Sequence, residues 1–193
     1  DLSWRSVALG ALGLGALARG AFAEAIAAFQ QAHDLCARMG NRWWTRANAA
    51  MLSYVLLERG ELRQAHARFE QMLAEAREQS DHDDVARTQI CLAQIAYEWD
   101  DLARAGDAAA EALALGEHFG SEEIWAQAAL VLARAEHGMG QTEAALRRLV
   151  GLLARLARED SPLRDRLARE ARLAQAGIQL AAGELAAVRR WAA

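Results

Sequence analysis

The sequence is poor in several residues on which other classes of protein depend. Lysine is absent and all 22 basic residues are arginine, so a phosphate-binding loop with its obligatory lysine is excluded. A single proline, Pro162, and the absence of Asn-Gly and Pro-Gly pairs leave little of the punctuation that β-hairpins need. Apolar runs fall short of the roughly 18 residues that a membrane-spanning helix requires. These absences favour an all-helical protein outside the membrane.

Cysteine and charge are also sparse. Cys36 and Cys91 both lie in helical stretches and do not make a disulfide framework, so we expect a reduced protein in the cytoplasm. The net charge of −4 is spread along the chain without a basic stripe, and nothing argues that this segment itself binds nucleic acid. The sequence starts without methionine at Asp1 and stops within a helical pattern, which predicts a fragment of a longer protein.

What is present is a repeat of about 40 residues in a chain dominated by strong helix formers. Residues suited to the left-handed end of a helix recur at Gly20, Gly60, Asp100, Gly140 and Gly183. A second series lies halfway between them, at Gly40, Ser80, Gly120 and Asp160. The chain therefore turns about every 20 residues. We expect one helical-repeat domain with units at about 1–40, 41–80, 81–120, 121–160 and 161–193.

Two packing series run in the same register. In the second half of each unit, small and large residues alternate at helical spacing: Ala25, Phe29 and Ala32; Ala65, Phe69 and Met72; Ala105, Ala109 and Ala112; Ala145, Leu149 and Leu152. In the first half, a large residue precedes a small one: Leu12-Gly13, Leu52-Ser53, Leu92-Ala93 and Leu132-Ala133. Small residues allow close approach of helices while large ones fill the grooves. The pattern predicts about five antiparallel helix pairs.

A small residue, a glycine turn and then Ala-x3-Phe-x2-Ala resembles the tetratricopeptide pattern, whose unit has 34 residues. The longer unit here resembles the sensor array of MalT-like activators, large ATP-dependent members of the LuxR family. The stretches that carry the resemblance are residues 92–102, LAQIAYEWDDL, and residues 179–185, QLAAGEL, followed by Trp191-Ala192. The resemblance implies a right-handed α-solenoid in a bacterial transcriptional regulator, without cofactor or metal in this segment.

Apparent catalytic and metal motifs have structural interpretations. Gly13-Leu14-Gly15-Ala16-Leu17-Ala18 reads G-x-G-x-x-A, but it lies within a helical pattern where repeats need small residues, so we expect close helix packing. The run Asp81-His82-Asp83-Asp84 is expected to begin a helix after Ser80, with its carboxylates near the positive helix end. The histidines show no zinc-ligand spacing, and no serine has a recognisable histidine and acid partner. We expect no enzyme.

Six tryptophans make the chain rich in this residue. Aromatic side chains can anchor a ligand, but we expect most of these to fill gaps between the lengthened helices. Trp43, Trp44 and Trp125 start first helices near one rim of the array and are the expected exceptions.

The first helix of each pair lines the concave surface in tetratricopeptide arrays, so the register transfers the family's inward-facing positions to this chain. One column contains Tyr54, Gln94 and Arg134, a second Ala47, Arg87 and Gln127, and a third Leu57, Tyr97 and His137, with Glu58 and Glu98 following. In the first unit these columns contain Val7, Leu14 and Leu17, so that unit is expected to pack on a preceding repeat. Polar groups in units two to four suit a polar ligand or a peptide, although an ordinary solvated helix face explains them equally well.

Two functional hypotheses follow. By resemblance, the segment binds a small inducer or a regulatory protein and biases an ATP-dependent switch, with DNA bound only by a separate domain and with self-association left open. Alternatively, it is a tetratricopeptide scaffold for proteins or peptides without a link to transcription. Modules for ATP binding and DNA binding on either side would distinguish the two.

Overall fold

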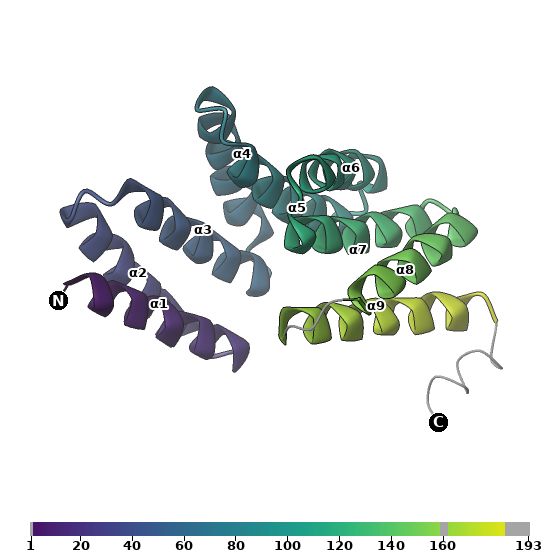
Figure 1. The fold of residues 1–193 in the computed structure, drawn as a ribbon, viewed down its shortest axis with the longest axis horizontal. Coiled ribbons are helices and arrows are strands. Elements are labelled where there is room, and N and C mark those ends of the chain that lie inside the picture. The colour runs from purple at the N-terminus through teal and green to yellow at the C-terminus, as the bar shows by residue number, and fades with distance from the viewer. Residues whose placement is uncertain (1, 159–161, 184–193) are drawn as a thin grey trace. The chain divides into compact units, whose positions relative to one another are not determined.

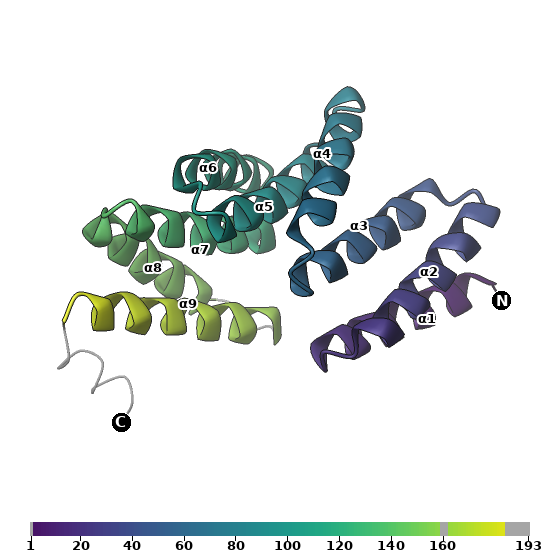
Figure 2. The same ribbon diagram turned by 180° about the vertical axis from the view of Figure 1, so that it is seen from behind.

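A computed structural model describes residues 2–158 and 162–183, which form nine α-helices and no strand. The helices are α1 (Leu2–Ala18), α2 (Phe22–Arg38), α3 (Arg42–Glu58), α4 (Leu62–Glu78), α5 (His82–Glu98), α6 (Leu102–Phe119), α7 (Glu122–Gly138), α8 (Thr142–Leu156) and α9 (Pro162–Ala181). The ribbon in Figures 1 and 2 shows successive helices folding back beside one another within each part of the chain. The all-helical prediction is confirmed. The expected turn at Asp160 and the stretch after Gly183, including Trp191, lie outside the described residues.

The turns follow from backbone conformation at the predicted positions. Both series adopt the left-handed region: φ is positive at Gly20, Gly40, Gly60, Gly120, Gly140 and Gly183, and also at Ser80 and Asp100. Glycine enters this region without the steric penalty that a Cβ imposes. At Asp100 φ is +61°, which departs from glycine as the sequence does. The 20-residue alternation of helices and turns is thus set by residues that end helices.

The chain divides into two compact units, Asp1–Gln71 and Met72–Ala193, with the division falling within α4. In the first, α2 packs against both α1 and α3. In the second, neighbouring helices from α5 to α9 pack in sequence, and α7 also contacts α5 and α9. Contacts of this kind, between elements close in sequence, are typical of a stacked helical repeat. The boundaries of the five predicted repeat units stay a prediction.

The predicted packing series form the core of each unit. Ala25, Phe29 and Ala32 of α2 are buried, as are their equivalents Ala105, Ala109 and Ala112 in α6. The glycine-rich stretch of α1 has the expected structural role, because a Cβ added at Gly13 would lie 2.6 Å from Cε1 of Phe29. Ser53, Ala93 and Ala133, at the same register position, are buried as well. Close approach of the first and second helices therefore depends on a small residue at this position.

None of the helices within the described residues combines the length and apolar character needed to cross a membrane. The two thiols in these residues are free, Cys36 buried and Cys91 half-buried.

Candidate functional site

The N-terminal ends of α5 and α7 place carboxylates on neighbouring helices. At α5, the Asp81 side chain accepts a hydrogen bond from the Asp84 backbone N–H at 3.2 Å, and Asp83 lies in the same first turn. At α7, Ser121 Oγ accepts from the Ile124 backbone N–H at 3.5 Å, and Glu123 follows. Side-chain caps and acidic groups near a helix N-terminus satisfy free N–H groups and offset the positive end of the helix dipole. The interpretation of Asp81–Asp84 as a helix start is confirmed.

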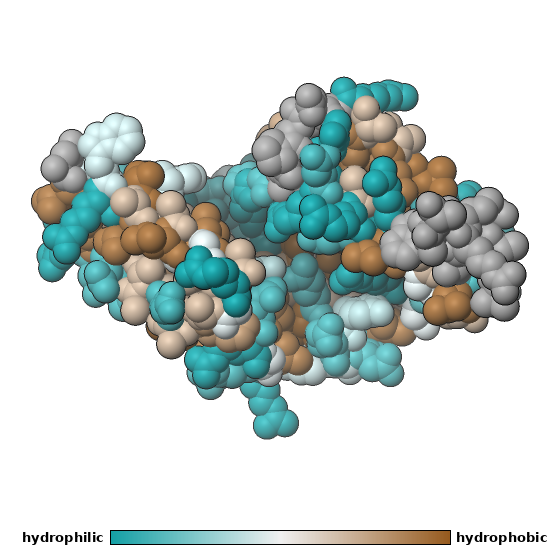
Figure 3. Space-filling model, turned by 90° about the horizontal axis from the view of Figure 1, so that it is seen from below, coloured by the Kyte–Doolittle hydropathy of each residue, from teal (hydrophilic) through white to brown (hydrophobic). Residues whose placement is uncertain are grey.

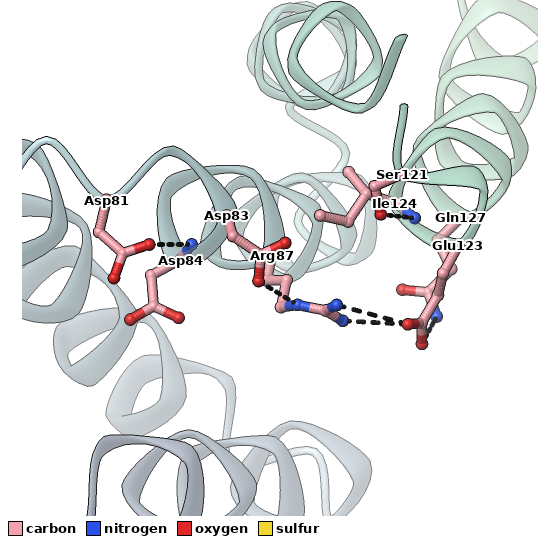
Figure 4. Close-up of polar contacts among 8 residues, drawn as sticks. All are labelled: Asp81, Asp83, Asp84, Arg87, Ser121, Glu123, Ile124 and Gln127. Atoms are coloured by element: carbon pink, nitrogen blue, oxygen red, sulfur yellow. Dashed lines mark hydrogen bonds and ion pairs between the residues drawn. The ribbon is translucent and has the colours of Figure 1, made fainter. Parts of the chain in front are cut away.

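Arg87 connects these two helix ends, as Figure 4 shows. Its Nε donates to Asp83 Oδ2 at 2.8 Å, one turn earlier on α5. Nη1 and Nη2 both reach Glu123 Oε2 on α7 at 3.4 Å. Gln127 Nε2 then donates to the other oxygen of Glu123, Oε1, at 3.4 Å. We call Asp83, Arg87, Glu123 and Gln127 the polar bridge.

The charge of the Arg87 guanidinium is balanced within the polar bridge. Burial lowers the pKa of Arg87, but the hydrogen bonds and charges of Asp83 and Glu123 outweigh this effect, so its pKa is raised overall. The guanidinium therefore stays protonated. Two carboxylates around one cation leave the bridge with an excess of negative charge, and an anionic ligand would have to compete with both for Arg87.

The polar bridge joins two of the predicted site residues and adds two that the sequence had not indicated. Arg87 and Gln127 belong to one predicted column, and both contact Glu123. Asp83 and Glu123 were interpreted as helix-start carboxylates. Each lies four residues before a member of that column and the two are 40 residues apart, so a parallel column was readable from the register.

The remaining candidates of the second unit are more dispersed. Gln94 is half-buried, while Glu98 and Arg134 are exposed. Arg134 forms no ion pair or hydrogen bond with the residues that the structure describes, so its guanidinium is available to a partner. Tyr97 packs against Ala96, Ala105 and Ala135. His137 Nδ1 lies 3.2 Å from Thr142 Oγ1, which ties it to the turn before α8.

Two predicted candidates belong to α3 in the first unit. Tyr54 is half-buried and Glu58 is exposed. Both lie on a first helix, as the register predicts, and their part in a binding face stays a prediction.

The expectation that most tryptophans fill gaps between helices is wrong for the described residues. Trp4 and Trp43 are 74% and 60% exposed, and Trp44 and Trp99 are also exposed. The two rings of Trp43 and Trp44 meet edge to face, with centroids 4.6 Å apart. Trp125, expected as an exception, is half-buried beneath the Arg155 guanidinium, whose Cζ lies 4.0 Å from the ring centroid. Composition reveals how many aromatic residues a chain has but not the helix face on which each lies.

Arg155 of α8 and Arg148 of α8 form the other strong polar contacts of the second unit. Arg155 binds Glu122 and, at 2.6 Å, Glu117, and the hydrogen bonds to Glu122 and then Glu117 raise its pKa. Arg148 reaches the buried carboxylate of Glu136 at 2.6 and 3.0 Å. These contacts fix α8 against α6 and α7 rather than presenting groups to a partner.

Comparison with solved structures identifies the class of protein as a tetratricopeptide-like helical repeat. The structure of kinesin light chain TPR-like repeats from Podosopora anserina matches with a TM-score of 0.66 and 19% identity, over 96% of this chain and 90% of that chain. A single-residue variant of the same repeats matches with a TM-score of 0.67. The apo form of RapI matches with a TM-score of 0.69 and 12% identity, over 93% of this chain and 48% of that chain. At these identities the likeness establishes the fold.

The family is narrower than the fold. Residues 1–193 match the MalT-like TPR region, and the chain belongs to that family. A search of curated proteins found no match.

Proposed function

We propose that this chain is the partner-binding sensor segment of a bacterial MalT-like, LuxR-family transcriptional activator. The observation that carries the proposal is the match to the MalT-like TPR region over the whole of residues 1–193. The nature of the described contacts, which stabilise helix packing around a polar face, is consistent with binding rather than catalysis. We expect the segment to act in the cytoplasm, and DNA to be bound by a separate domain of the same protein.

The polar bridge gives this segment a means of responding to a partner. In a stacked repeat each helix pair contacts only its neighbours, so a change at one pair of helices alters the local stacking angle. Arg87 holds α5 to α7 through the long 3.4 Å contacts to Glu123. A partner that binds Glu123 better in one arrangement than in another shifts the balance between the two arrangements. The altered stacking would then bias the ATP-dependent switch.

The charges favour a partner with particular groups. Asp83 and Glu123 outnumber Arg87 in the polar bridge, so a basic or hydrogen-bond-donating group of the partner is best suited to that end of α5 and α7. Arg134, exposed on the same helix as Glu123, offers a guanidinium to a carboxylate or phosphate. A regulatory protein or peptide presenting groups of both signs satisfies these requirements. A small inducer with both groups would do so as well.

Substitutions in the intact regulator test the proposal. Arg134→Ala and Glu123→Ala should each reduce inducer-dependent transcription about tenfold or more, since loss of one charge-assisted contact costs about 1.5–3 kcal/mol. Arg147→Ala is the matched control, because this arginine of α8 is mostly exposed and pairs only with Glu143 on its own helix. An unchanged response in both Arg134→Ala and Glu123→Ala, with protein levels maintained, would refute the proposed face.

The alternative is a tetratricopeptide scaffold without a link to transcription. The likeness to kinesin light chain repeats supports it as far as the fold goes. The encoded polypeptide distinguishes the two: a phosphate-binding loop on the N-terminal side and a helix-turn-helix on the C-terminal side favour the activator. Their absence from the polypeptide would favour the scaffold.

A further inference from the structure

One face of α1 is apolar and exposed. Leu2, Trp4, Val7, Leu12 and Leu14 are between 43% and 74% exposed, and Arg5 is the single charged residue of the helix. Figure 3 shows brown and pale beads gathered at the left, where α1 lies in Figure 1. A contiguous exposed apolar face of this kind marks an interaction surface.

The repeat register identifies which part of this face other units bury. Ala8 and Leu12 are exposed on α1. Their equivalents 80 residues later, Thr88 and Leu92 on α5, are buried, and so are Ala128 and Leu132 on α7. Gly15, half-buried, corresponds to the buried Ile95 and Ala135. We call Arg5, Ala8, Leu12 and Gly15, which share one helical face, the α1 strip.

The structure also shows what covers the equivalent strip elsewhere. Leu132 and Ala128 of α7 share a core cluster with Ala108, Ala109 and Ala112 of α6, the second helix of the preceding pair. The approach is close, because a Cβ added at Gly116 of α6 would lie 2.7 Å from the Trp125 backbone nitrogen. In the first unit, Leu52 and Val55 of α3 pack in the same way against the α1–α2 pair. A first helix is thus covered by the small-residue face of the second helix before it.

A cleft of about 230 Å³ lies beside the α1 strip, between α1 and α2. Its lining includes Arg5, Leu9, Gln31, Asp34 and Arg38. The register equivalents of Leu9 and Gln31 are Gln89 and Glu111, which are hydrogen-bonded to each other. There Arg77, from the preceding second helix α4, reaches Glu111 at 2.9 Å. The cleft therefore stands where a preceding second helix inserts a charged side chain.

The charges of the cleft specify that side chain. Hydrogen bonds from His33 and Gln30 lower the pKa of Asp34, so this carboxylate is charged and already has local donors. Arg5 and Arg38 form no ion pair with other residues in the described part of the chain. The cleft is thus positive where the α5–α6 counterpart is negative, and a carboxylate is the complementary group.

From these observations, we propose that the α1 strip docks the second helix of another helix hairpin of this repeat type, located before α1 in the polypeptide. That helix presents small residues to Ala8 and Leu12 and a carboxylate to Arg5 and Arg38. A second copy of this chain does not offer the required helix within its described residues. Ala25, Ala65, Ala105 and Ala145, which head the small-residue faces of α2, α4, α6 and α8, are all fully buried.

The chain supplies its own probe. Residues 81–120, fused directly before residue 1, place an α5–α6 hairpin ahead of α1 with the 40-residue interval preserved, because residue 121 follows residue 120 just as residue 1 does in the fusion. In this hairpin Glu117 takes the register position of Arg77 and carries the required carboxylate. Amide hydrogen exchange of α1 should slow about tenfold or more in the fusion relative to the unfused chain, because docking adds to the free energy of local opening.

Two substitutions in the fusion make the test specific. Leu12→Glu on α1 should abolish the added protection. Leu14→Glu should retain it, because Leu14 is equally apolar and exposed, but its equivalents Gln94 and Arg134 are polar and not buried. Glu117→Arg in the fused hairpin should reduce the protection severalfold.

Several results would overturn the proposal. One is a fused hairpin that stays unfolded by circular dichroism, or that folds without protecting α1. Another is equal sensitivity to Leu12→Glu and Leu14→Glu. A third is an unfused chain that dimerises in light scattering and is made monomeric by Leu12→Glu, which would assign the α1 strip to a second copy.

Discussion

Single residues decide how closely the helices approach one another. Gly116 of α6 lies against the α7 backbone, with only 2.7 Å between its added Cβ and the Trp125 nitrogen. Gly151 of α8 has no atom within 4 Å of that position. Gly116→Ala should destabilise the protein by about 1–3 kcal/mol, because backbone atoms cannot yield without a shift of the helices. Gly151→Ala should stabilise it by about 0.5–1 kcal/mol through helix propensity.

Urea unfolding of the two alanine variants measures this difference directly. Since both place alanine within a helix, the propensity gain is common to them, and the opposite signs isolate the helix contact. Equal stability changes would show that α6 and α7 tolerate a wider separation than the structure has.

Asp100 is a second site at which one residue controls a turn. Its φ of +61° is a left-handed conformation that five glycines adopt in the other equivalent or half-unit turns before residue 150. Asp100→Gly should raise the free energy of unfolding by about 0.5–1 kcal/mol, because it removes the steric strain of the Cβ. The neighbouring Asp101 is the matched control, because it caps α6 by accepting from the Arg104 backbone N–H. Asp101→Ala should cost about 1 kcal/mol; a stability gain from both variants would contradict this account.

At the scale of helices, Arg155 fastens α8 to the corner between α6 and α7. Glu122 and Glu117 bind its guanidinium, which also stacks on Trp125. Arg155→Lys should lower stability by about 1 kcal/mol, a value reduced for partial exposure, because lysine cannot hold two carboxylates and stack at once. Arg147→Lys, also on α8 but mostly exposed, should change stability by less than about 0.5 kcal/mol. Thermal unfolding at moderate salt provides the comparison.

The helices themselves were predictable because their boundaries and packing depend on local patterns. Left-handed turn residues and the Ala25–Phe29–Ala32 type of spacing recur at a fixed interval, and each recurrence reinforces the others. The same register placed Arg87 and Gln127 in one column, and the polar bridge joins them. It did not reveal that Glu123 lies between them, because side-chain direction depends on the packing angle of α5 and α7. The exposure of Trp4 and Trp99 was missed for the same reason.

At the scale of the whole molecule, the described contacts run between helices that are neighbours, or next but one, in sequence. Phe29 is buried in the cluster with Ala16, Ala25 and Val55, while Leu149 belongs to the cluster of α7, α8 and α9. Phe29→Ala should cost about 3–5 kcal/mol and Leu149→Ala about 2–5 kcal/mol. Because repeat stability is a sum of local terms, each cost should fall mainly on its own part of the chain.

Amide hydrogen exchange tests this reciprocity. Phe29→Ala should accelerate exchange in α1, α2 and α3, whereas α8 and α9 keep the rates of the original chain. Leu149→Ala should produce the opposite pattern, so each variant is the control for the other. Uniform acceleration in both variants would mean that the chain opens as one cooperative body. Local opening would leave α5 and α7 free to change their stacking at the polar bridge without unfolding α1 and α2, which is what a sensor segment that responds to a partner requires.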